Sequence, residues 1–210
     1  VRMGGPEVTG NMKLKLALAK AKANNVPKDN IQRAIQKGAG AQDGSNYEEI
    51  TYEGYGPAGV AIMVDTLTDN RNRTAADVRH LFSKHGGNLG ETGCVGWMFK
   101  RKGVFAIDGD AGYTEDDLMM LVLDSGAEDI KSEDGTFEIT TEPADFEAVE
   151  KVLADNNVAV MMSEISMIPD TMAELSPEDA AKVQRLIDAL EDLDDVQDVF
   201  TNADLPDEEE

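Results

Sequence analysis

The sequence contains few residues of several types, and each shortage excludes a class of protein. Its 210 residues include one cysteine, Cys94, which excludes a disulfide framework and a zinc site built from several cysteines. The apolar runs, such as 60–64 and 158–162, are far shorter than the roughly 20 residues that a membrane-spanning helix requires. No basic-then-apolar signal segment opens the chain, so we expect a protein of the reducing cytoplasm that does not contact a membrane.

Cations are scarce as well, but they are unevenly distributed. The chain has 19 Lys and Arg residues against 42 Asp and Glu residues, a formal net charge of −23 that, if uniform, would repel any polyanion. Residues 1–44 nevertheless carry eight basic and three acidic residues, a net charge of +5, and the remainder carries −28. Random placement would put about four cations in this first segment, so contact between it and nucleic acid is a reasonable hypothesis.

The basic segment has the pattern of a small helical hairpin. Asn11 is the expected N-cap of a first helix that runs to about Ala23, with apolar residues repeating on one face. Pro27 opens a second helix, Gly38 is expected to end it, and residues 39–46 have the composition of a linker. The candidate phosphate contacts are Lys13, Lys15, Lys20, Lys22, Lys28, Arg33 and Lys37. The alternative interpretation of these cations is an ordinary solvated helix surface.

The remainder of the chain alternates between strand and helix patterns. The segment 103–169 has the order β-α-β-β-α-β, which is the ferredoxin-like split motif. The segment before Lys102 has an incomplete version of the same motif, with a strand at 60–68, a helix at 72–85 and two short strands, the second at 94–100. It needs one more helix and one more strand. The helix after Ser176 and the strand at 196–201 supply them, and strands at 104–108 and 158–168 are assigned to the inserted unit.

We therefore predict an α+β fold with a small N-terminal helical domain and two ferredoxin-like α/β domains, one inserted in the other. The predicted parts are a basic helical domain truncated at its N-terminus (1–44), a discontinuous α/β domain (45–102 and 170–203), an inserted βαββαβ domain (103–169) and an acidic tail (204–210). Three sequential domains are the alternative, but that arrangement leaves two sheets half covered.

Signatures of catalysis are also missing. His80 and His85 are five residues apart on a predicted helix and so point to different sides. Cys94 lacks the flanking residues of a thiol nucleophile, and the glycine-rich runs 54–59 and 86–93 lack the Lys-Ser/Thr ending of a P-loop. We therefore expect a protein that is not an enzyme and that uses no metal and no cofactor.

A second candidate for anion binding is the run 68–74, with the sequence TDNRNRT. It places Arg71 and Arg73 at the start of a predicted helix, where unpaired backbone N–H groups and two guanidinium groups favour an anion. The two arginines are candidate contacts for an anion or for RNA. Pairing with neighbouring carboxylates is the alternative.

Five ordered motifs resemble one family. They are 26–38 (VPKDNIQRAIQKG), 52–57 (YEGYGP), 68–74 (TDNRNRT), 86–90 (GGNLG) and 97–99 (WMF). Over essentially the whole chain, the sequence resembles the YebC/PmpR family, which includes the mitochondrial translational activator of cytochrome c oxidase subunit one. The resemblance implies a helical domain, two α/β domains around a cleft, and a cytoplasmic regulator of gene expression.

Together with the charge asymmetry, the resemblance leads us to expect nucleic acid, DNA or RNA, as the partner, with the ribosome as a further candidate, and we expect the protein to be a monomer. The first hypothesis is a DNA-binding regulator of transcription, and the alternative is a ribosome-associated factor that aids translation of proline-rich stretches. A ligand-sensing or protein-docking module is a lower alternative. Members of the family begin with a strongly basic segment of the type Gly-His-Ser-Lys-Trp-Ala-Asn-Ile-Lys, which this sequence lacks, so we expect some nucleic-acid contacts to lie outside these 210 residues.

Overall fold

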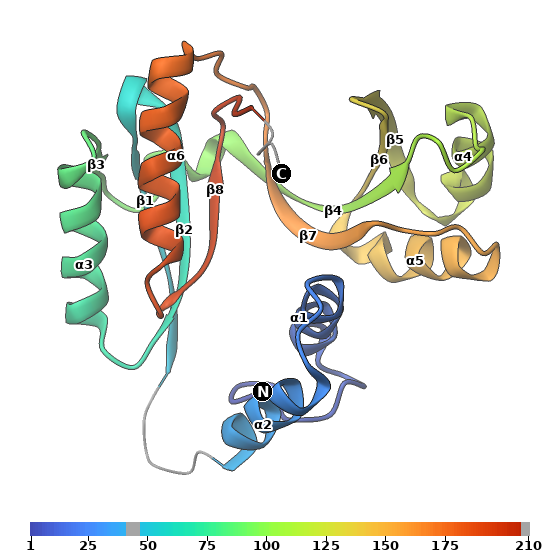
Figure 1. Ribbon diagram of the computed structural model, residues 1–210, viewed down its shortest axis with the longest axis horizontal. Coiled ribbons are helices and arrows are strands. Elements are labelled where there is room, and N and C mark those ends of the chain that lie inside the picture. The colour runs from blue at the N-terminus through green and yellow to red at the C-terminus, as the bar shows by residue number, and fades with distance from the viewer. Residues whose placement is uncertain (41–46, 207–210) are drawn as a thin grey trace. The chain divides into compact units, whose positions relative to one another are not determined.

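The computed structural model describes residues 1–40 and 47–206 and contains two compact units, each built from two stretches of chain (Figure 1). Unit 1 comprises residues 1–44 and 101–166, and unit 2 comprises residues 45–100 and 167–210. Two four-stranded sheets and several helices make up the described residues, which confirms the predicted α+β fold class. The predicted limits of the domains stay a prediction.

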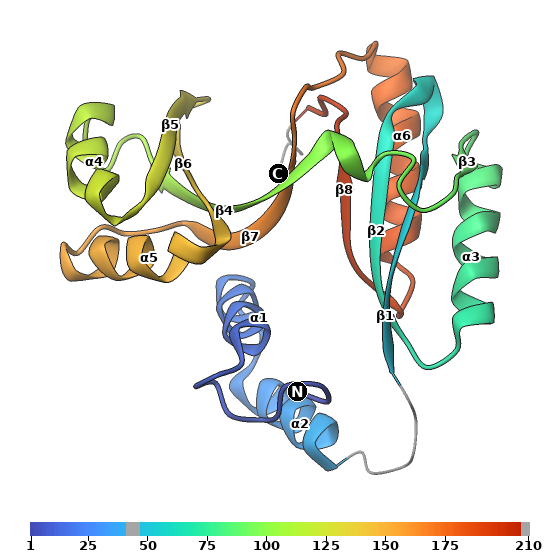
Figure 2. The same cartoon turned by 180° about the vertical axis from the view of Figure 1, so that it is seen from behind.

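The sheet of unit 2 has the strand order β3-β1-β2-β8, with its neighbouring strands antiparallel. Its elements are β1 (Glu48–Tyr55), β2 (Ala61–Thr68), α3 (Arg71–Lys84), β3 (Asn88–Leu89), α6 (Pro177–Glu191) and β8 (Val196–Thr201). Helices α3 and α6 lie beside each other along this sheet (Figures 1 and 2). The sequence patterns explain both helices, because Asn70 caps α3 and Ser176 caps α6, each by accepting a backbone N–H with its side chain.

Strand β2 is buried on both faces along residues 61–64, which are all apolar. Ile62 and Val64 pack in one core with Phe82 of α3 and with α6. The alternate residues, among them Met63, pack in a second cluster with Phe99. The two clusters follow from the period-two alternation of a strand and hold the hairpin β1-β2 in place.

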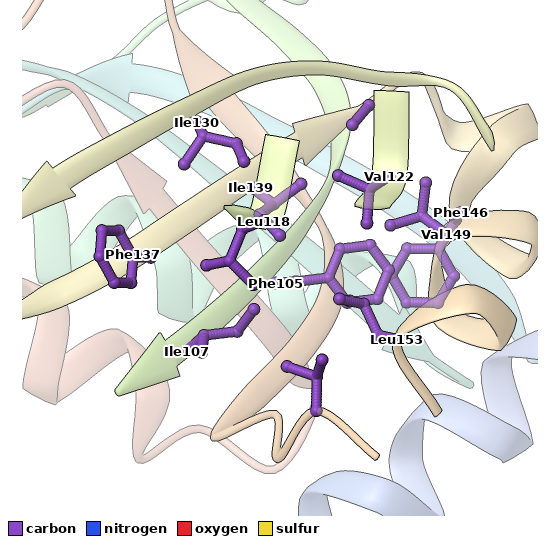
Figure 3. Close-up of a cluster of buried hydrophobic side chains, with 12 residues drawn as sticks. Phe105, Ile107, Leu118, Val122, Ile130, Phe137, Ile139, Phe146, Val149 and Leu153 are labelled. Carbon is purple, nitrogen blue, oxygen red and sulfur yellow. The ribbon is translucent and has the colours of Figure 1, made fainter. Parts of the chain in front are cut away.

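The sheet of unit 1 has the order β5-β6-β4-β7. Its elements are β4 (Phe99–Asp108), α4 (Glu115–Val122), β5 (Ala127–Glu133), β6 (Thr136–Thr141), α5 (Phe146–Asp155) and β7 (Met162–Pro169). This chain order is the ferredoxin-like motif that the sequence predicts. The core lies between the sheet and the two helices, and Phe105 stacks on Phe146 with ring centroids 4.7 Å apart (Figure 3). Short 3₁₀ turns occur at η1 (Pro57–Gly59), η2 (Gly96–Met98), η3 (Leu123–Ser125) and η4 (Pro143–Asp145).

The N-terminal helices of unit 1 are α1 (Met12–Ala23) and α2 (Lys28–Gly40). The predicted cap is confirmed, because the Asn11 side chain accepts the Leu14 N–H at 3.1 Å. The predicted stop at Gly38 is wrong, since α2 continues to Gly40. Gly38 serves a close approach instead: a Cβ at this position would lie 3.0 Å from the Val1 Cβ. Of the predicted linker, residues 39 and 40 belong to α2, and residues 41–46 lie outside the described part of the chain.

The predicted strand at 94–100 is also wrong. Residues 94–98 form turns and the short helix η2, and the strand begins at Phe99 and runs without a break to Asp108. The prediction assigns residues 94–100 to the sheet of unit 2. In the structure β1 is a strand of that sheet instead, and it pairs with both β2 and β3. The last strand of unit 1 likewise begins at Met162 rather than at residue 158.

Candidate nucleic-acid interface

The seven candidate cations of the N-terminal segment all lie on α1 and α2. Those exposed to solvent are Lys13, Lys20, Lys22, Lys28, Arg33 and Lys37. Lys15 is half-buried and its Nζ lies 2.5 Å from Glu150 Oε2 of α5, an ion pair within unit 1. Six of the seven side chains are therefore exposed, whereas Lys15 is half-buried beside a carboxylate.

Helical spacing groups the exposed cations on faces. Lys13 and Lys20 are seven residues apart, which is about two turns, and so share one face of α1. Arg33 and Lys37 are four residues apart and share a face of α2. Arg33 Nη2 also donates to Asn30 Oδ1 at 2.7 Å, which holds the guanidinium along the helix surface. The cations thus form short rows of the kind that can follow a phosphate backbone.

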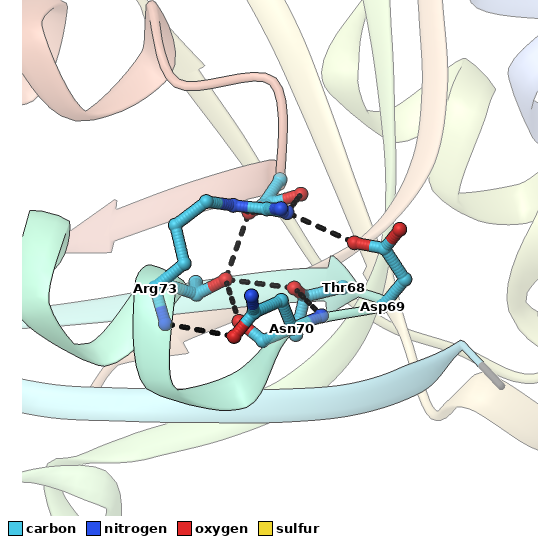
Figure 4. A network of polar contacts seen from close by, with 6 residues as sticks. Thr68, Asp69, Asn70 and Arg73 are labelled. Atoms are coloured by element: carbon cyan, nitrogen blue, oxygen red, sulfur yellow. Dashed lines mark hydrogen bonds and ion pairs between the residues drawn. The ribbon is translucent and has the colours of Figure 1, made fainter. Parts of the chain in front are cut away.

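The second candidate, Arg73, lies in a network of polar contacts at the N-terminus of α3 (Figure 4). Its guanidinium donates to both carboxylate oxygens of Asp195, at 3.0 and 2.8 Å, and to Asp69 Oδ1 at 3.0 Å. Thr74 Oγ1 lies 2.8 Å from Asp195 Oδ2. The hydrogen bond with Asp195, followed by that with Asp69, raises the pKa of Arg73 above its ordinary value.

Asp195 is ionised in this network. Burial alone would raise its pKa, but hydrogen bonds from Arg73 and Thr74, together with the positive charge of Arg73, outweigh burial and hold the pKa below its ordinary value of 3.8. A depression of about 710 Å³ beside the network has the acidic lining residues Asp69, Asp77, Asp192, Asp194 and Asp195. An anion at Arg73 would have to displace two carboxylates in acidic surroundings.

Arg71 is more open than Arg73. Its guanidinium lies 3.9 Å from Glu48, and its side chain is 68% exposed. The anion or RNA contact at Arg71 and Arg73 stays a prediction, and the geometry favours the alternative of carboxylate pairing for Arg73.

Sequence reasoning missed Glu53, a carboxylate on β1 that is only 6% exposed. It accepts the backbone N–H groups of Gly93 at 2.5 Å and Val95 at 3.3 Å, and also that of Gly96. These bonds hold the loop 90–98, which we call the Glu53-anchored loop. The available signal was a carboxylate between apolar residues of a strand and beside Gly54, whose missing Cβ allows Asn88 to approach closely.

Two exposed aromatic residues bond the Glu53-anchored loop at one point: Trp97 belongs to the loop, and Tyr55 is the last residue of β1. Trp97 is 71% exposed, and its indole N–H donates to the carbonyl oxygen of Cys94 at 3.1 Å. The Tyr55 hydroxyl donates to the same oxygen at 3.2 Å. Both residues lie in motifs that resemble the family, Tyr55 in 52–57 and Trp97 in 97–99, but their sequence context predicts no role for either.

Cys94 itself does not have the properties of a nucleophile. Burial, followed by the charge of Glu53, raises the pKa of its thiol above the ordinary value of 9.0. A thiol with a raised pKa carries little of the thiolate that nucleophilic catalysis requires. Its side chain packs beside the cluster that contains Val95 and Phe99.

The described residues, 1–40 and 47–206, contain neither a cluster of metal ligands nor a helix suited to a membrane. Their His, Cys, Asp and Glu residues form no group of three or more that could hold a metal ion. No helix among them combines the length and the apolar character needed to cross a membrane.

Comparison with known proteins identifies the family. Residues 1–41 match the TACO1/YebC protein N-terminal domain, and residues 47–203 match the TACO1/YebC second and third domain. A relative from Desulforamulus reducens is 55% identical over 202 residues, which cover 96% of this chain and 84% of the relative. A relative from Clostridium tetani is 56% identical over 205 residues, which cover 98% of this chain and 83% of the relative. Both are named "Probable transcriptional regulatory protein".

A solved structure is similar over the same extent. A conserved hypothetical protein from Aquifex aeolicus has 43% sequence identity and a TM-score of 0.81, and the match covers 99% of this chain and 85% of that one. The family models match both parts of the sequence, and the relatives match nearly all of it. The resemblance found in the five motifs is thus confirmed, and the chain belongs to the TACO1/YebC family.

Proposed function

We propose that this protein is a non-enzymatic regulator of gene expression that binds nucleic acid, in the manner of a DNA-binding transcriptional regulator, through α1 and α2. The names of its relatives support the regulatory role. The observation that carries the nucleic-acid contact is the charge asymmetry. The first 44 residues have a net charge of +5 against −28 for the remainder, and six of the seven cations on these helices are exposed.

The charge distribution also explains how contact would be confined to one part of the chain. The acidic remainder repels phosphates, whereas lysines on helix faces can neutralise them and release the bound counterions. If six cations each neutralise one phosphate of duplex DNA, the logarithm of the affinity falls with the logarithm of salt concentration at a slope of about −5. Such binding is largely independent of base sequence, because phosphate contacts position a protein without reading bases.

The test compares two charge variants of the full chain. The helix variant replaces Lys13, Lys20, Lys22 and Lys37 with Gln. The control makes the same change of charge elsewhere, and its replaced residues are Arg79, Lys131, Lys151 and Lys182. Binding of labelled duplex DNA is measured by fluorescence anisotropy over a range of salt concentrations. We expect the helix variant to lose about three to four units of salt slope and the control to lose less than one.

Two outcomes would overturn the proposal: binding that does not depend on salt, or equal losses in the helix variant and the control. A parallel titration with structured RNA and cosedimentation with ribosomes test the alternative of a translation factor. If the protein binds ribosomes more tightly than duplex DNA, and the helix variant loses that binding, the helices contact RNA rather than DNA.

A further inference from the structure

The exposed aromatic pair of unit 2 has no role in the proposed phosphate contacts. Trp97 is the only tryptophan of the 210 residues, and 71% of its surface is exposed. Large aromatic residues are usually buried in part, and an exposed one on a well-held loop commonly marks a binding surface. Tyr55 lies beside it, because the indole N–H and the phenol O–H both donate to the Cys94 carbonyl oxygen.

The pair is held in place before any partner arrives. Glu53 accepts three backbone N–H groups of the loop that precedes Trp97, and buried Val95 fixes the loop to the core of unit 2. Each ring is also held at its polar end by a hydrogen bond. A partner that contacts these rings therefore meets groups whose conformational entropy is already largely lost, which favours binding.

The polar atoms of the pair indicate what kind of contact remains. In protein interfaces, Trp and Tyr commonly use the indole N–H or the hydroxyl to bond the partner. Here both donors already bond Cys94, so the rings offer chiefly their faces and edges. Nucleic-acid bases are flat and stack on aromatic rings irrespective of their sequence.

Charge near this loop favours an anionic partner over a basic or neutral one. Residues 84–100 of unit 2 contain two cations, Lys84 and Lys100, and one carboxylate, Glu91, although residues 45–210 as a whole carry only 11 cations against 39 carboxylates. Lys84 and Lys100 of unit 2 are exposed, and Lys100 lies 3.0 Å from Asp170 with 65% of its side chain still exposed. Lys102 is bound by Glu128 and Glu142 and does not contribute.

We infer that the Trp97–Tyr55 pair is a stacking site for an unpaired base of a single-stranded nucleic acid, with Lys100 near the phosphates that flank it. The inference rests on the proposed function, since it specifies a form of nucleic acid that the protein binds. It adds a contact in unit 2 that responds to bases, whereas the helices of unit 1 contact phosphates.

The single tryptophan makes the inference directly measurable. The full chain is titrated with a fluorescently labelled 30-nucleotide single-stranded RNA, and two signals are followed: the anisotropy of the label, which reports all binding, and the emission of Trp97 with an unlabelled copy. Stacking of a base on the indole quenches its emission. We expect quenching to follow the same binding curve as anisotropy, and the quenching at saturation to stay constant as salt weakens the affinity.

Two variants and two ligands serve as controls. Trp97→Leu is expected to lower the affinity for single-stranded RNA about tenfold, and Trp97→Phe, which keeps an aromatic face, by less than about threefold. Both variants should fold, because the side chain is mostly exposed. An abasic strand of the same length and a duplex of the same sequence should bind without quenching, since neither offers an unpaired base.

The outcomes separate this inference from the proposed function. Anisotropy binding without quenching, or equal affinities of the Trp97→Leu and Trp97→Phe variants, would overturn the stacking site and leave the phosphate contacts intact; the pair would then be a surface for a protein partner. Quenching with an unchanged affinity and salt slope in the variant without Lys13, Lys20, Lys22 and Lys37 would support the stacking site while contradicting the proposed helix interface. Absence of binding to the single-stranded RNA would overturn the stacking site alone, and absence of binding to duplex DNA as well would overturn both.

Discussion

Removal of the Glu53 carboxylate should loosen the loop that carries Trp97. Charge-assisted hydrogen bonds contribute about 1.5–3 kcal/mol each, and an N–H group left unsatisfied in the interior costs about 1–3 kcal/mol. Val95 is completely buried, so its N–H would find no water, whereas Gly93 is exposed and its N–H can be solvated. We therefore expect Glu53→Ala to lower the free energy of unfolding by about 3–5 kcal/mol.

The Glu53→Gln variant tests the same reasoning with the shape of the side chain preserved. Its amide oxygen can still accept from Val95 and Gly96, but its NH₂ group would face the N–H of Gly93, a donor against a donor. Since water can replace the lost bond at Gly93, we expect a cost of about 1–2 kcal/mol. Urea unfolding gives the free energies, and amide hydrogen exchange at Val95 shows whether the loop opens locally.

The matched control is Glu91→Gln, which neutralises an exposed carboxylate of the same loop. A change within about 0.5 kcal/mol is expected, because surface substitutions away from a bonded network have small effects. The reasoning is refuted if Glu53→Ala unfolds at the same urea concentration as Glu91→Gln and the exchange of the Val95 amide is unchanged. Glu53 would then not stabilise the loop, and other contacts would have to hold the aromatic pair in place.

Three further predictions concern the rest of the fold. Because the pKa of Asp195 is lowered, its hydrogen bonds stabilise unit 2 fully above about pH 3.8, and this stabilisation is lost as the pH falls through the folded-state pKa. The melting temperature of Asp195→Asn should therefore depend less on pH in that acid range than the melting temperature of the unmodified protein. Phe105→Ala removes a completely buried ring stacked on Phe146 and should cost about 3–5 kcal/mol in urea unfolding, against about 1 kcal/mol for Phe105→Leu. Gly38→Ala should raise the helix content measured by circular dichroism and the free energy of unfolding by up to about 1 kcal/mol, because Gly38 lies inside α2. The Val1 side chain needs to move by only a few tenths of an ångström to admit the methyl group. A loss of helix would instead support the predicted stop at Gly38.

Local signals were enough for much of the fold. The Asn11 cap, the Thr114–Asp117 capping box and the turn at Asp134-Gly135 each act within a few residues, so the elements that they delimit could be predicted. The cations of α1 and α2 could be named in the same way. What could not be predicted is that Lys15 binds Glu150, because 135 residues separate the partners along the chain.

The errors have a common cause. Glycine at position 38 predicts a helix stop, yet α2 continues to Gly40 and Gly38 packs closely against Val1. Residues 94–100 have strand propensity, but the N–H groups of Gly93, Val95 and Gly96 bond the Glu53 carboxylate rather than a neighbouring strand. In both cases, a partner that is distant in sequence outweighed a local preference.

The sequence by itself determined the charge asymmetry, the helices that carry the cations, the α+β class and the membership of the TACO1/YebC family, because composition, periodicity and ordered motifs can be read without three-dimensional contacts. Only the tertiary structure showed that Arg73 is bound by Asp195 and Asp69, that Glu53 holds the loop of Trp97, and that Tyr55 of β1 and Trp97 both bond the Cys94 carbonyl oxygen. These arrangements depend on hydrogen bonds between residues up to 122 positions apart, and folding is what brings such groups within 3 Å or so of each other.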